Sequence, residues 1–295
     1  MSCTRPSQIG HKEQMLDPIE ARQKRDQLVR DGFAIVPGIL GDPLLSQLQR
    51  WSQEVFEAVP VDPRYQYQGS DIHVYTESHW QQMDREPDHR QFPAPIVEQL
   101  LNHEPQKQVC AELGLEDVRS AGGSLILLSK PAFGPPLYWH QDFTNWDHPE
   151  AAAPWPTRIF LSYYMSDTSR ENGCLRVIPG THRKRIELHD LLPNAHTPEI
   201  QAIDDLDHPI FMDHPDSIDV PLRTGDLIIA DARLLHAAWP NQTDQRRTLV
   251  LAWHDVFSFP QPPSWWTGEI PDAIRDYDPS FTCPSTRTPS AYLPR

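Results

Sequence analysis

Apolar and polar positions alternate at helical spacing in the first part of the chain. Asp17-Pro18 combines a capping side chain with a proline in the first turn, and this predicts a helix over residues 17–30 that ends at Gly32. Residues 33–40 are typical of a short strand. Asp42-Pro43 begins a second amphipathic helix in the same way, and a third helix is expected over residues 95–113.

Residues 60–90 show a different pattern. Tyrosine, histidine and tryptophan alternate there with polar residues, and no helical or strand period is sustained. A stretch of this length without a clear element is either disordered or a functional lid. Its aromatic content favours the lid, which would cover a binding site.

From residue 121 onward the chain consists of short apolar runs separated by glycine, proline and asparagine. These runs cover residues 124–129, 137–142, 158–165, 174–178, 220–223, 226–230, 234–239 and 247–256. Turn residues at Asn172-Gly173, Thr224-Gly225 and Asn241 predict three hairpins between neighbouring runs. About eight short strands at this spacing predict a mainly β fold with flanking helices, whose core is a double-stranded β-helix (a cupin-like jelly roll).

The pattern predicts a single domain over residues 1–295, because a two-domain α+β arrangement would need a linker and none is evident. Residues 17–115 would form a mostly helical N-terminal part with the lid, and residues 121–258 the jelly-roll core. Residues 259–295 would form a proline-rich tail. Within the core, the acidic and histidine-rich stretch 187–219 is expected to be an insertion loop.

Composition narrows the function class. Proline accounts for 31 of the 295 residues, which favours turns over long helices. A net charge of -15 makes nucleic acid an unexpected partner, because an acidic surface repels phosphates. The four cysteines form no Cys-x-x-Cys pair, and we find neither a signal peptide nor a membrane-spanning apolar run. We therefore expect a cytoplasmic protein; its oligomeric state is left open.

The stretch from Tyr138 to Trp146 carries the strongest chemical signal. Its His140 and Asp142 are two residues apart, so on an extended backbone both side chains point to the same side. An imidazole and a carboxylate in this arrangement can hold neighbouring positions of a divalent metal. Two histidines and one carboxylate on one face of an octahedron form the site of non-haem Fe(II) oxygenases, so one further histidine is needed.

His236 is the preferred third ligand, because it lies in the strand-like run 234–239. Arg247 follows across the turn at Asn241, and a hairpin there would bring it back beside the histidine. A guanidinium binds a carboxylate in a two-pronged way, which suits the distant end of a metal-bound keto acid.

Several motifs together resemble one known family. These are His140-Gln-Asp142, the run from Glu171 to His182, Gly225-Asp226, the set His236…Asn241…Arg247 and the N-terminal stretch 31–38. They are similar, in order, to the phytanoyl-CoA dioxygenase family, and the stretch 138–146 is also similar to the metal strand of ectoine hydroxylases.

This resemblance implies a jelly-roll core, Fe(II) and 2-oxoglutarate as cofactors, and O2 as a second substrate. It implies that His140, Asp142 and His236 bind the metal and that Arg247 binds the far carboxylate of 2-oxoglutarate. The implied reaction oxidises an unactivated C–H bond, most often by hydroxylation, and releases succinate and CO2. Some relatives halogenate and replace the acidic ligand with a small residue, but Asp142 is present here.

Other candidates carry weaker signals. Ser162 and Thr144 are candidates to hydrogen-bond the co-substrate or the substrate, whereas the second His-x-acid pair, His148-Pro149-Glu150, is interpreted as a loop. A small metabolite or natural-product intermediate is the expected substrate. Two alternatives remain open: a zinc-dependent hydrolase on the same scaffold, or a small-molecule binding protein without turnover.

Overall fold

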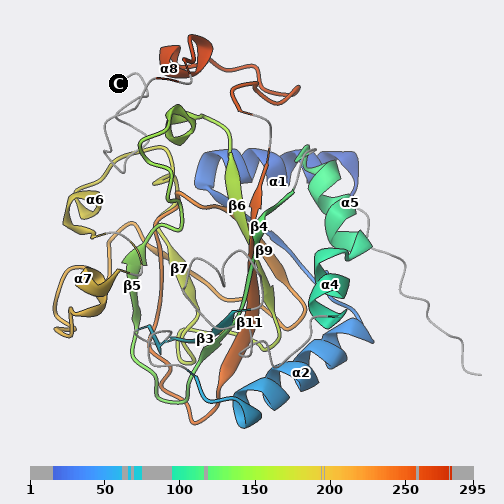
Figure 1. The fold of residues 1–295 in the computed structure, drawn as a ribbon, viewed down its shortest axis with the longest axis vertical. Coiled ribbons are helices and arrows are strands. Elements are labelled where there is room, and N and C mark those ends of the chain that lie inside the picture. Colours follow the sequence, from blue (N-terminus) through green and yellow to red (C-terminus); the bar gives the residue numbers. More distant parts are fainter. Residues whose placement is uncertain are drawn as a thin grey trace, which may run out of the picture.

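The computed structural model describes residues 16–61, 66–67, 70–74, 95–115, 119–193, 195, 197–256, 259–278 and 280. Two antiparallel sheets face each other, and helices cover the outer side of the larger sheet (Figure 1). The longer helices are α1 (Pro18–Asp31), α2 (Leu44–Ala58), α4 (Pro95–Leu101) and α5 (Glu104–Glu112). Four short helices follow in chain order: η3 (Pro149–Ala152), α6 (Leu188–Leu191), α7 (Pro198–Gln201) and α8 (Asp272–Arg275). This arrangement confirms the predicted fold class.

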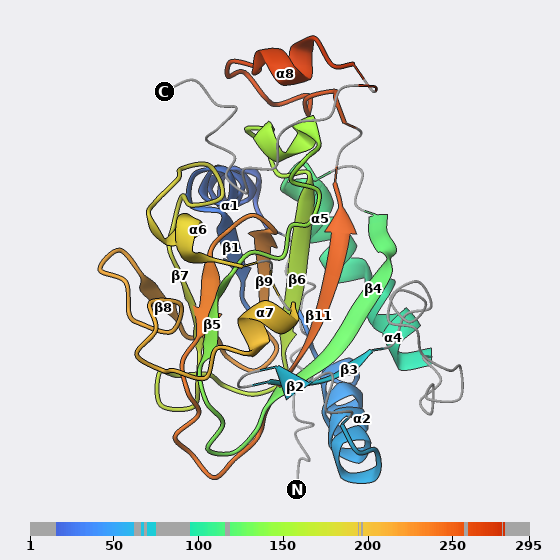
Figure 2. The same cartoon turned by 60° about the vertical axis from the view of Figure 1, so that its left-hand side comes forward.

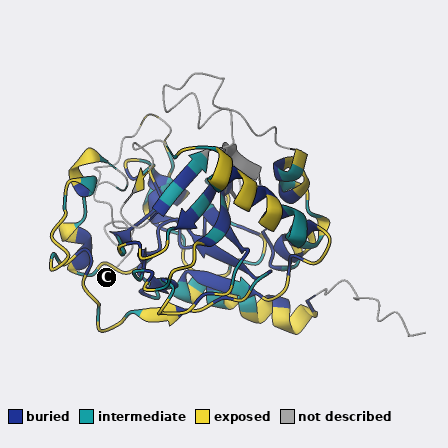
Figure 3. Cartoon of the chain, turned by 90° about the horizontal axis from the view of Figure 1, so that it is seen from below, coloured by how far each residue is buried: buried dark blue, intermediate teal, exposed yellow. Residues whose placement is uncertain are grey.

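The larger sheet has seven strands in the order β1-β9-β6-β11-β4-β3-β2. Its strands are β1 (Phe33–Val36), β2 (Gln66–Tyr67), β3 (Ser70–Val74), β4 (Arg119–Lys130), β6 (Arg158–Tyr164), β9 (Leu227–Asp231) and β11 (Arg247–Asp255). Alternate residues of β6, β9 and β11 face the helices and form one large core with Leu28 of α1, Leu48 of α2 and Val109 of α5. The exposed sides of these helices face solvent (Figure 3).

The smaller sheet has four strands in the order β5-β10-β7-β8, and its strands β5, β7 and β8 are labelled on the left of Figure 2. Its strands are β5 (Leu137–His140), β7 (Leu175–Val177), β8 (Ile218–Val220) and β10 (His236–Ala238). Between the two sheets lies a second core, in which Phe160 and Ile228 of the larger sheet pack with Val177 and Val220 of the smaller one. The inner faces of both sheets therefore enclose the space into which functional side chains can point.

The predicted α1 is confirmed together with its caps. The carboxylate of Asp17 accepts hydrogen bonds from the backbone N–H groups of Ile19 and Glu20, and Gly32 ends the helix in the left-handed conformation at φ 90°. At α2 the prediction fails in detail, because the side chain of Asp42 does not cap the helix and instead accepts from the Ser46 hydroxyl.

All three predicted hairpins are wrong in the same way. Strands β6 and β7, β8 and β9, and β10 and β11 each follow one another across a turn, but the two members of every pair belong to different sheets. The turn residues do reverse the chain, yet each turn also carries it across the sandwich. Hydrogen-bonded partners are therefore distant in sequence, as for β10 with β5 and β7.

Three further predictions need correction. Part of the expected lid, residues 66–67 and 70–74, forms β2 and β3, and β3 pairs with β4; most of the remaining stretch lies outside the described residues. The expected helix 95–113 is two helices, because Pro105 cannot donate to the carbonyl four residues earlier and its ring clashes there. The stretch 187–219 is not only a loop, since it contains α6, α7 and most of β8.

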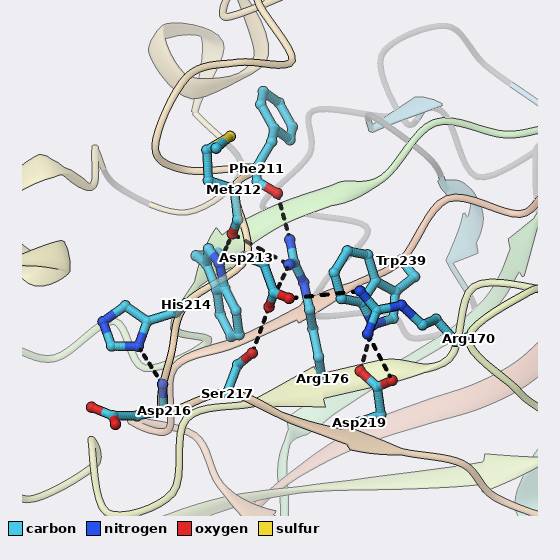
Figure 4. A network of polar contacts seen from close by, with 11 residues as sticks. Arg170, Arg176, Phe211, Met212, Asp213, His214, Asp216, Ser217, Asp219 and Trp239 are labelled. Carbon is cyan, nitrogen blue, oxygen red and sulfur yellow. Dashed lines mark hydrogen bonds and ion pairs between the residues drawn. The ribbon is translucent and has the colours of Figure 1, made fainter.

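The segment 205–217 is fastened to the outer face of the smaller sheet by a ladder of stacked side chains (Figure 4). The guanidinium of Arg176 lies 4.6 Å from the ring centre of Trp139 and 4.1 Å from that of Trp239, and Arg170 stacks on the other side of Trp239 at 3.9 Å. Arg176 donates to the carbonyl oxygens of Phe211 at 2.7 Å and of Met212 at 3.2 Å. Cation–π stacking and charged hydrogen bonds thus hold this segment against β5.

The segment after β11 folds back onto the body. Indole Nε1 of Trp265 donates to the carbonyl oxygen of Gly114, and Trp266 packs edge-on against Trp155. Within the described ranges, none of the helices has the length and apolar character that a membrane crossing needs.

Candidate metal centre

The structure brings the three predicted ligands together between the sheets. His140 is the last residue of β5 and His236 is the first of β10, and the two are direct partners in the strand register. Their ring centres are 4.1 Å apart. Asp142 follows β5, and its carboxylate points at both imidazoles. Nε2 of His140 lies 3.5 Å from one oxygen and Nε2 of His236 lies 3.8 Å from the other.

Hydrogen bonds fix the orientation and the tautomer of both imidazoles. Nδ1 of His140 lies 2.9 Å from the carbonyl oxygen of Tyr138, and Nδ1 of His236 lies 3.0 Å from that of Leu234. A carbonyl oxygen only accepts, so each Nδ1 carries a hydrogen, and Nε2, on the side of Asp142, is the nitrogen that can bind a metal. This outer hydrogen bond is the usual companion of a metal-binding histidine.

This donor set fits a divalent transition metal. One ligand atom from each of the three residues lies within 4.8 Å of the others, and this is the only such cluster of His, Cys, Asp or Glu among the described residues. Imidazole nitrogens and a carboxylate oxygen suit iron, and three protein ligands on one side leave positions for small molecules.

Arg247 lies buried at the start of β11, with its side chain on the inner face. Its Nη2 donates to the carbonyl oxygen of Gly173 at 2.7 Å, but Nε and Nη1 have no hydrogen-bond partner. Burial lowers the pKa of Arg247, and the nearby Tyr164 and Cys174 oppose this effect. A buried guanidinium with two unsatisfied N–H groups is costly, which is the condition expected for a site that binds an anion.

A second buried basic side chain lies next to it. Lys130 is the direct register partner of Arg247 on β4, and its Nζ donates to the carbonyl oxygen of Pro135 at 2.9 Å. Burial, followed by the charges of Arg247 and Arg176, holds the pKa of Lys130 well below its usual value. Sequence reasoning missed Lys130, since its only signal is a charged residue at the end of an apolar run. A carboxylate bound here would face two basic side chains, and its negative charge would favour the protonated form of Lys130.

The inner face of β6 connects the two places. The ring centres of Phe160 and His236 are 5.0 Å apart, and the guanidinium carbon of Arg247 lies 6.0 Å from the ring centre of Tyr164. These two residues are four positions apart, which is about 13 Å along a strand. Ser162 is buried between them on the same face. Burial also raises the pKa of Tyr164 to about 12, so this hydroxyl is neutral at physiological pH.

The other sequence candidates lie elsewhere. Thr144 is exposed two positions beyond Asp142, and its hydroxyl accepts a hydrogen bond from Arg158 at 3.4 Å. His148 caps the short η3 through its Nδ1, and the Glu150 carboxylate accepts from Asn145. His148 and Glu150 therefore have structural partners of their own, but the segment after His148 is a short 3-10 helix rather than the expected loop.

Sequence reasoning also missed the residues that support the ligands. Gln141, between two ligands, donates through its amide to the carbonyl oxygen of Arg233 at 2.5 Å. Arg233 itself forms a fully buried ion pair with Asp231 at 2.6 Å. The signal in the sequence was an Asp-x-Arg pair inside the apolar run that leads to His236, which neither helical nor strand periodicity explains.

The fold and the site together define a jelly-roll protein with a His-x-Asp…His metal centre. Comparison of the sequence with known families then gives the particular family: residues 28–249 match the family described as Phytanoyl-CoA dioxygenase (PhyH), and the protein belongs to this family. The resemblance derived from the motifs is confirmed.

Two similar curated proteins are ectoine dioxygenases. That of Nocardia farcinica is 27% identical over 164 residues, which cover 50% of this chain and 53% of the relative. That of Sphingopyxis alaskensis is 30% identical over 121 residues, 39% of each chain. The chain thus spans about half the length, or less, of these relatives.

Solved structures share the fold over most of the chain. The epimerase SnoN, in complex with Fe3+, alpha ketoglutarate and nogalamycin RO, superposes with a TM-score of 0.56 at 20% identity, covering 92% of this chain and 95% of SnoN. EctD from S. alaskensis with bound Fe gives a TM-score of 0.54 at 23% identity, covering 85% and 82%. At these identities the likeness establishes the fold alone.

Proposed function

We propose that the protein is an Fe(II)- and 2-oxoglutarate-dependent dioxygenase that oxidises, most often by hydroxylation, an unactivated C–H bond of a small molecule. The observation that carries this proposal is the pairing of two sites in the space between the two sheets. One is the triad of His140, Asp142 and His236, and the other is the buried guanidinium of Arg247 with two unsatisfied N–H groups. Membership of the family supports the same activity.

The residues have distinct roles in this proposal. His140, Asp142 and His236 would hold iron, which when bound supplies the capacity to activate dioxygen and to couple loss of CO2 from a 2-oxo acid to C–H oxidation. Arg247 binds the far carboxylate of 2-oxoglutarate through Nε and Nη1, with the basic side chain of Lys130 beside it. Ser162 lies between Phe160 and Tyr164 on the inner face of β6, which supports the proposal that it hydrogen-bonds the co-substrate.

The proposed role of Thr144 at the co-substrate is less direct. Its hydroxyl lies on the exposed side of the stretch after Asp142, where it accepts from Arg158. A contact with the co-substrate or the substrate would have to replace that hydrogen bond, so Thr144 is better placed at the edge of the site than beside Arg247.

The proposed substrate is a small metabolite or natural-product intermediate with a substantial apolar part. Leu128 and Leu251 face the inner side of the larger sheet beside Ile126 and Ser162, and both remain partly exposed to solvent. Apolar side chains exposed on an inner face are suited to a ring or hydrocarbon body. The relatives named above act on, or come from pathways to, small molecules, which agrees with this class.

We also propose a single domain in a reducing compartment, the cytoplasm. Both sheets share the core between them, which supports one folding unit. The cysteines that the structure describes, Cys110 and Cys174, are buried free thiols. A reducing environment preserves such thiols.

The test is oxygen-dependent succinate production. Protein loaded with Fe(II) is incubated with 2-oxoglutarate and a panel of small metabolites, and succinate is quantified. We expect succinate with wild-type protein and none with His140→Ala. Hydrolysis of a panel compound without consumption of 2-oxoglutarate would instead identify a zinc hydrolase. Ligand affinity that survives in His140→Ala, without any turnover in wild type, would identify a binding protein.

A further inference from the structure

A buried turn leads into one of the two strands that carry metal ligands and accepts hydrogen bonds from the segment that carries the other two ligands. This turn, residues 231–235, connects β9 to β10 and leads directly into His236. Three successive carbonyl oxygens of the turn each accept a hydrogen bond from a segment that holds a ligand. The carbonyl of Ala232 accepts from the backbone N–H of Phe143 at 2.9 Å, and that of Arg233 accepts from the amide of Gln141 at 2.5 Å.

The third carbonyl completes the set. The carbonyl oxygen of Leu234 accepts from Nδ1 of His236 at 3.0 Å. The first two hydrogen bonds flank Asp142 in sequence, and the third orients an imidazole on the opposite strand. One short turn therefore fixes the carboxylate of one segment and the imidazole of another against a common reference.

The turn is itself held rigidly by the side chain of Arg233. Its guanidinium grips the Asp231 carboxylate in a two-pronged way, at 2.9 Å and 2.6 Å, and both side chains are 1% exposed. The remaining N–H groups donate to the carbonyl oxygens of three residues on or just after η3, with distances from 2.7 to 3.1 Å for Ala151, Ala153 and Trp155. All five N–H groups of this buried guanidinium are hydrogen-bonded, and such charged, two-pronged bonds are strong and fix the geometry of their partners.

We propose that Arg233 and Gln141 are positioning residues of the metal centre: through the carbonyl groups of the turn 231–235 they set the relative placement of Asp142 and His236. This inference rests on the proposed function, because it assumes that the triad holds a metal. It goes further than the proposed function because it attributes part of the metal affinity to residues that do not touch the metal. Changes in such outer hydrogen bonds typically cost 10- to 100-fold in metal affinity.

Substitution of Gln141 tests this inference without adding a charge near the metal. Gln141→Met keeps the length of the side chain and removes the donor to the Arg233 carbonyl. The control is Gln49→Met, because Gln49, which is more exposed than Gln141, makes the same kind of bond on helix α2, from its amide to the carbonyl oxygen of Met165 at 2.9 Å. Arg233→Lys is a second test variant, which keeps the charge but loses the two-pronged grip on Asp231.

The measurement is an anaerobic titration of the full chain with Co(II), followed by its visible absorption spectrum, together with the melting temperature without metal. We expect Gln141→Met to bind Co(II) about 10- to 100-fold more weakly, with a changed spectrum, and Gln49→Met to bind it within twofold of wild type. If Gln141→Met loses stability as Gln49→Met does but keeps wild-type Co(II) affinity and spectrum, the inference is overturned. A different outcome would refute the proposed function itself: wild type gives no Co(II) spectrum, or gives one that His140→Ala does not abolish.

Discussion

Replacing Arg247 by methionine should weaken co-substrate binding without lowering the stability of the ligand-free protein. The guanidinium is buried with Nε and Nη1 unsatisfied, and no carboxylate pairs with it among the described residues. Exchange of a buried, unpaired charge for an apolar residue of similar length removes the penalty of burying that charge, which is on the order of several kcal/mol per ion. Loss of the bond to the Gly173 carbonyl costs about 1–3 kcal/mol in return. We therefore expect the ligand-free melting temperature of Arg247→Met to be close to or above that of wild type.

Binding of 2-oxoglutarate should suffer strongly. Removing one partner of a buried charged pair costs about 2–5 kcal/mol, which corresponds to roughly 30- to 4,000-fold weaker binding. The assay is calorimetric titration of 2-oxoglutarate into protein loaded with Mn(II) under anaerobic conditions, alongside thermal denaturation without ligand.

The neighbouring arginine provides the control. Arg246 points to the other face of the sheet, where it bonds the Ser129 hydroxyl at 2.6 Å and lies over the ring of Phe56 at 4.5 Å. Arg246→Met should leave the affinity for 2-oxoglutarate unchanged and lower the melting temperature slightly. An Arg247→Met variant that binds 2-oxoglutarate within threefold of wild type would refute the assignment of the anchor.

Three further predictions follow from other buried contacts. Burial lowers the pKa of His182 from 6.5 to about 4, so stability present above pH 6.5 is lost as the pH falls toward 4, by up to about 3 kcal/mol. Thermal denaturation at pH 4–7 should show a shallower pH dependence for His182→Gln, with a part remaining from His189, whose pKa is also about 4. Gly173→Ala should lower the free energy of unfolding, measured in urea, more than Gly38→Ala does. Both glycines have positive φ, but only a Cβ at 173 would meet other atoms. It would lie 2.5 Å from the Lys130 side chain and 2.7 Å from the Trp239 carbonyl oxygen. Arg176→Lys should speed proteolytic cleavage within residues 205–217, because a lysine cannot stack between both indoles while donating to two carbonyl groups; cleavage at the wild-type rate would contradict the anchoring role of the ladder.

The sequence predicts which residues form strands better than it predicts which strands pair. The metal ligands were identifiable because His140 and Asp142 lie two apart on an extended run and His236 lies in a strand-like run, all of which are local features. Pairing is not local. The turn at Asn172-Gly173 specifies a reversal of direction, but whether the next strand joins the same sheet depends on contacts with residues far along the chain.

The supporting residues were missed for a related reason. Arg233 looks like a surface residue in sequence, and only the tertiary structure surrounds it with Asp231 and three carbonyl groups. Lys130 is comparable, since it becomes buried only when β4 pairs with β11. Buried charges break the rule that polar positions face solvent, so a pattern of hydropathy assigns them to the wrong side.

The strands at the margins of both sheets are short. β1 has four residues, β2 two, β5 four and β8 three, and the N–H of Trp139 on β5 is already engaged by the carbonyl oxygen of Ile210. Unpaired margins of this kind are where another polypeptide could add a strand, and brevity is one way in which proteins prevent that. Any self-association of this protein should therefore use side-chain surfaces rather than continuation of a sheet from one copy into the next.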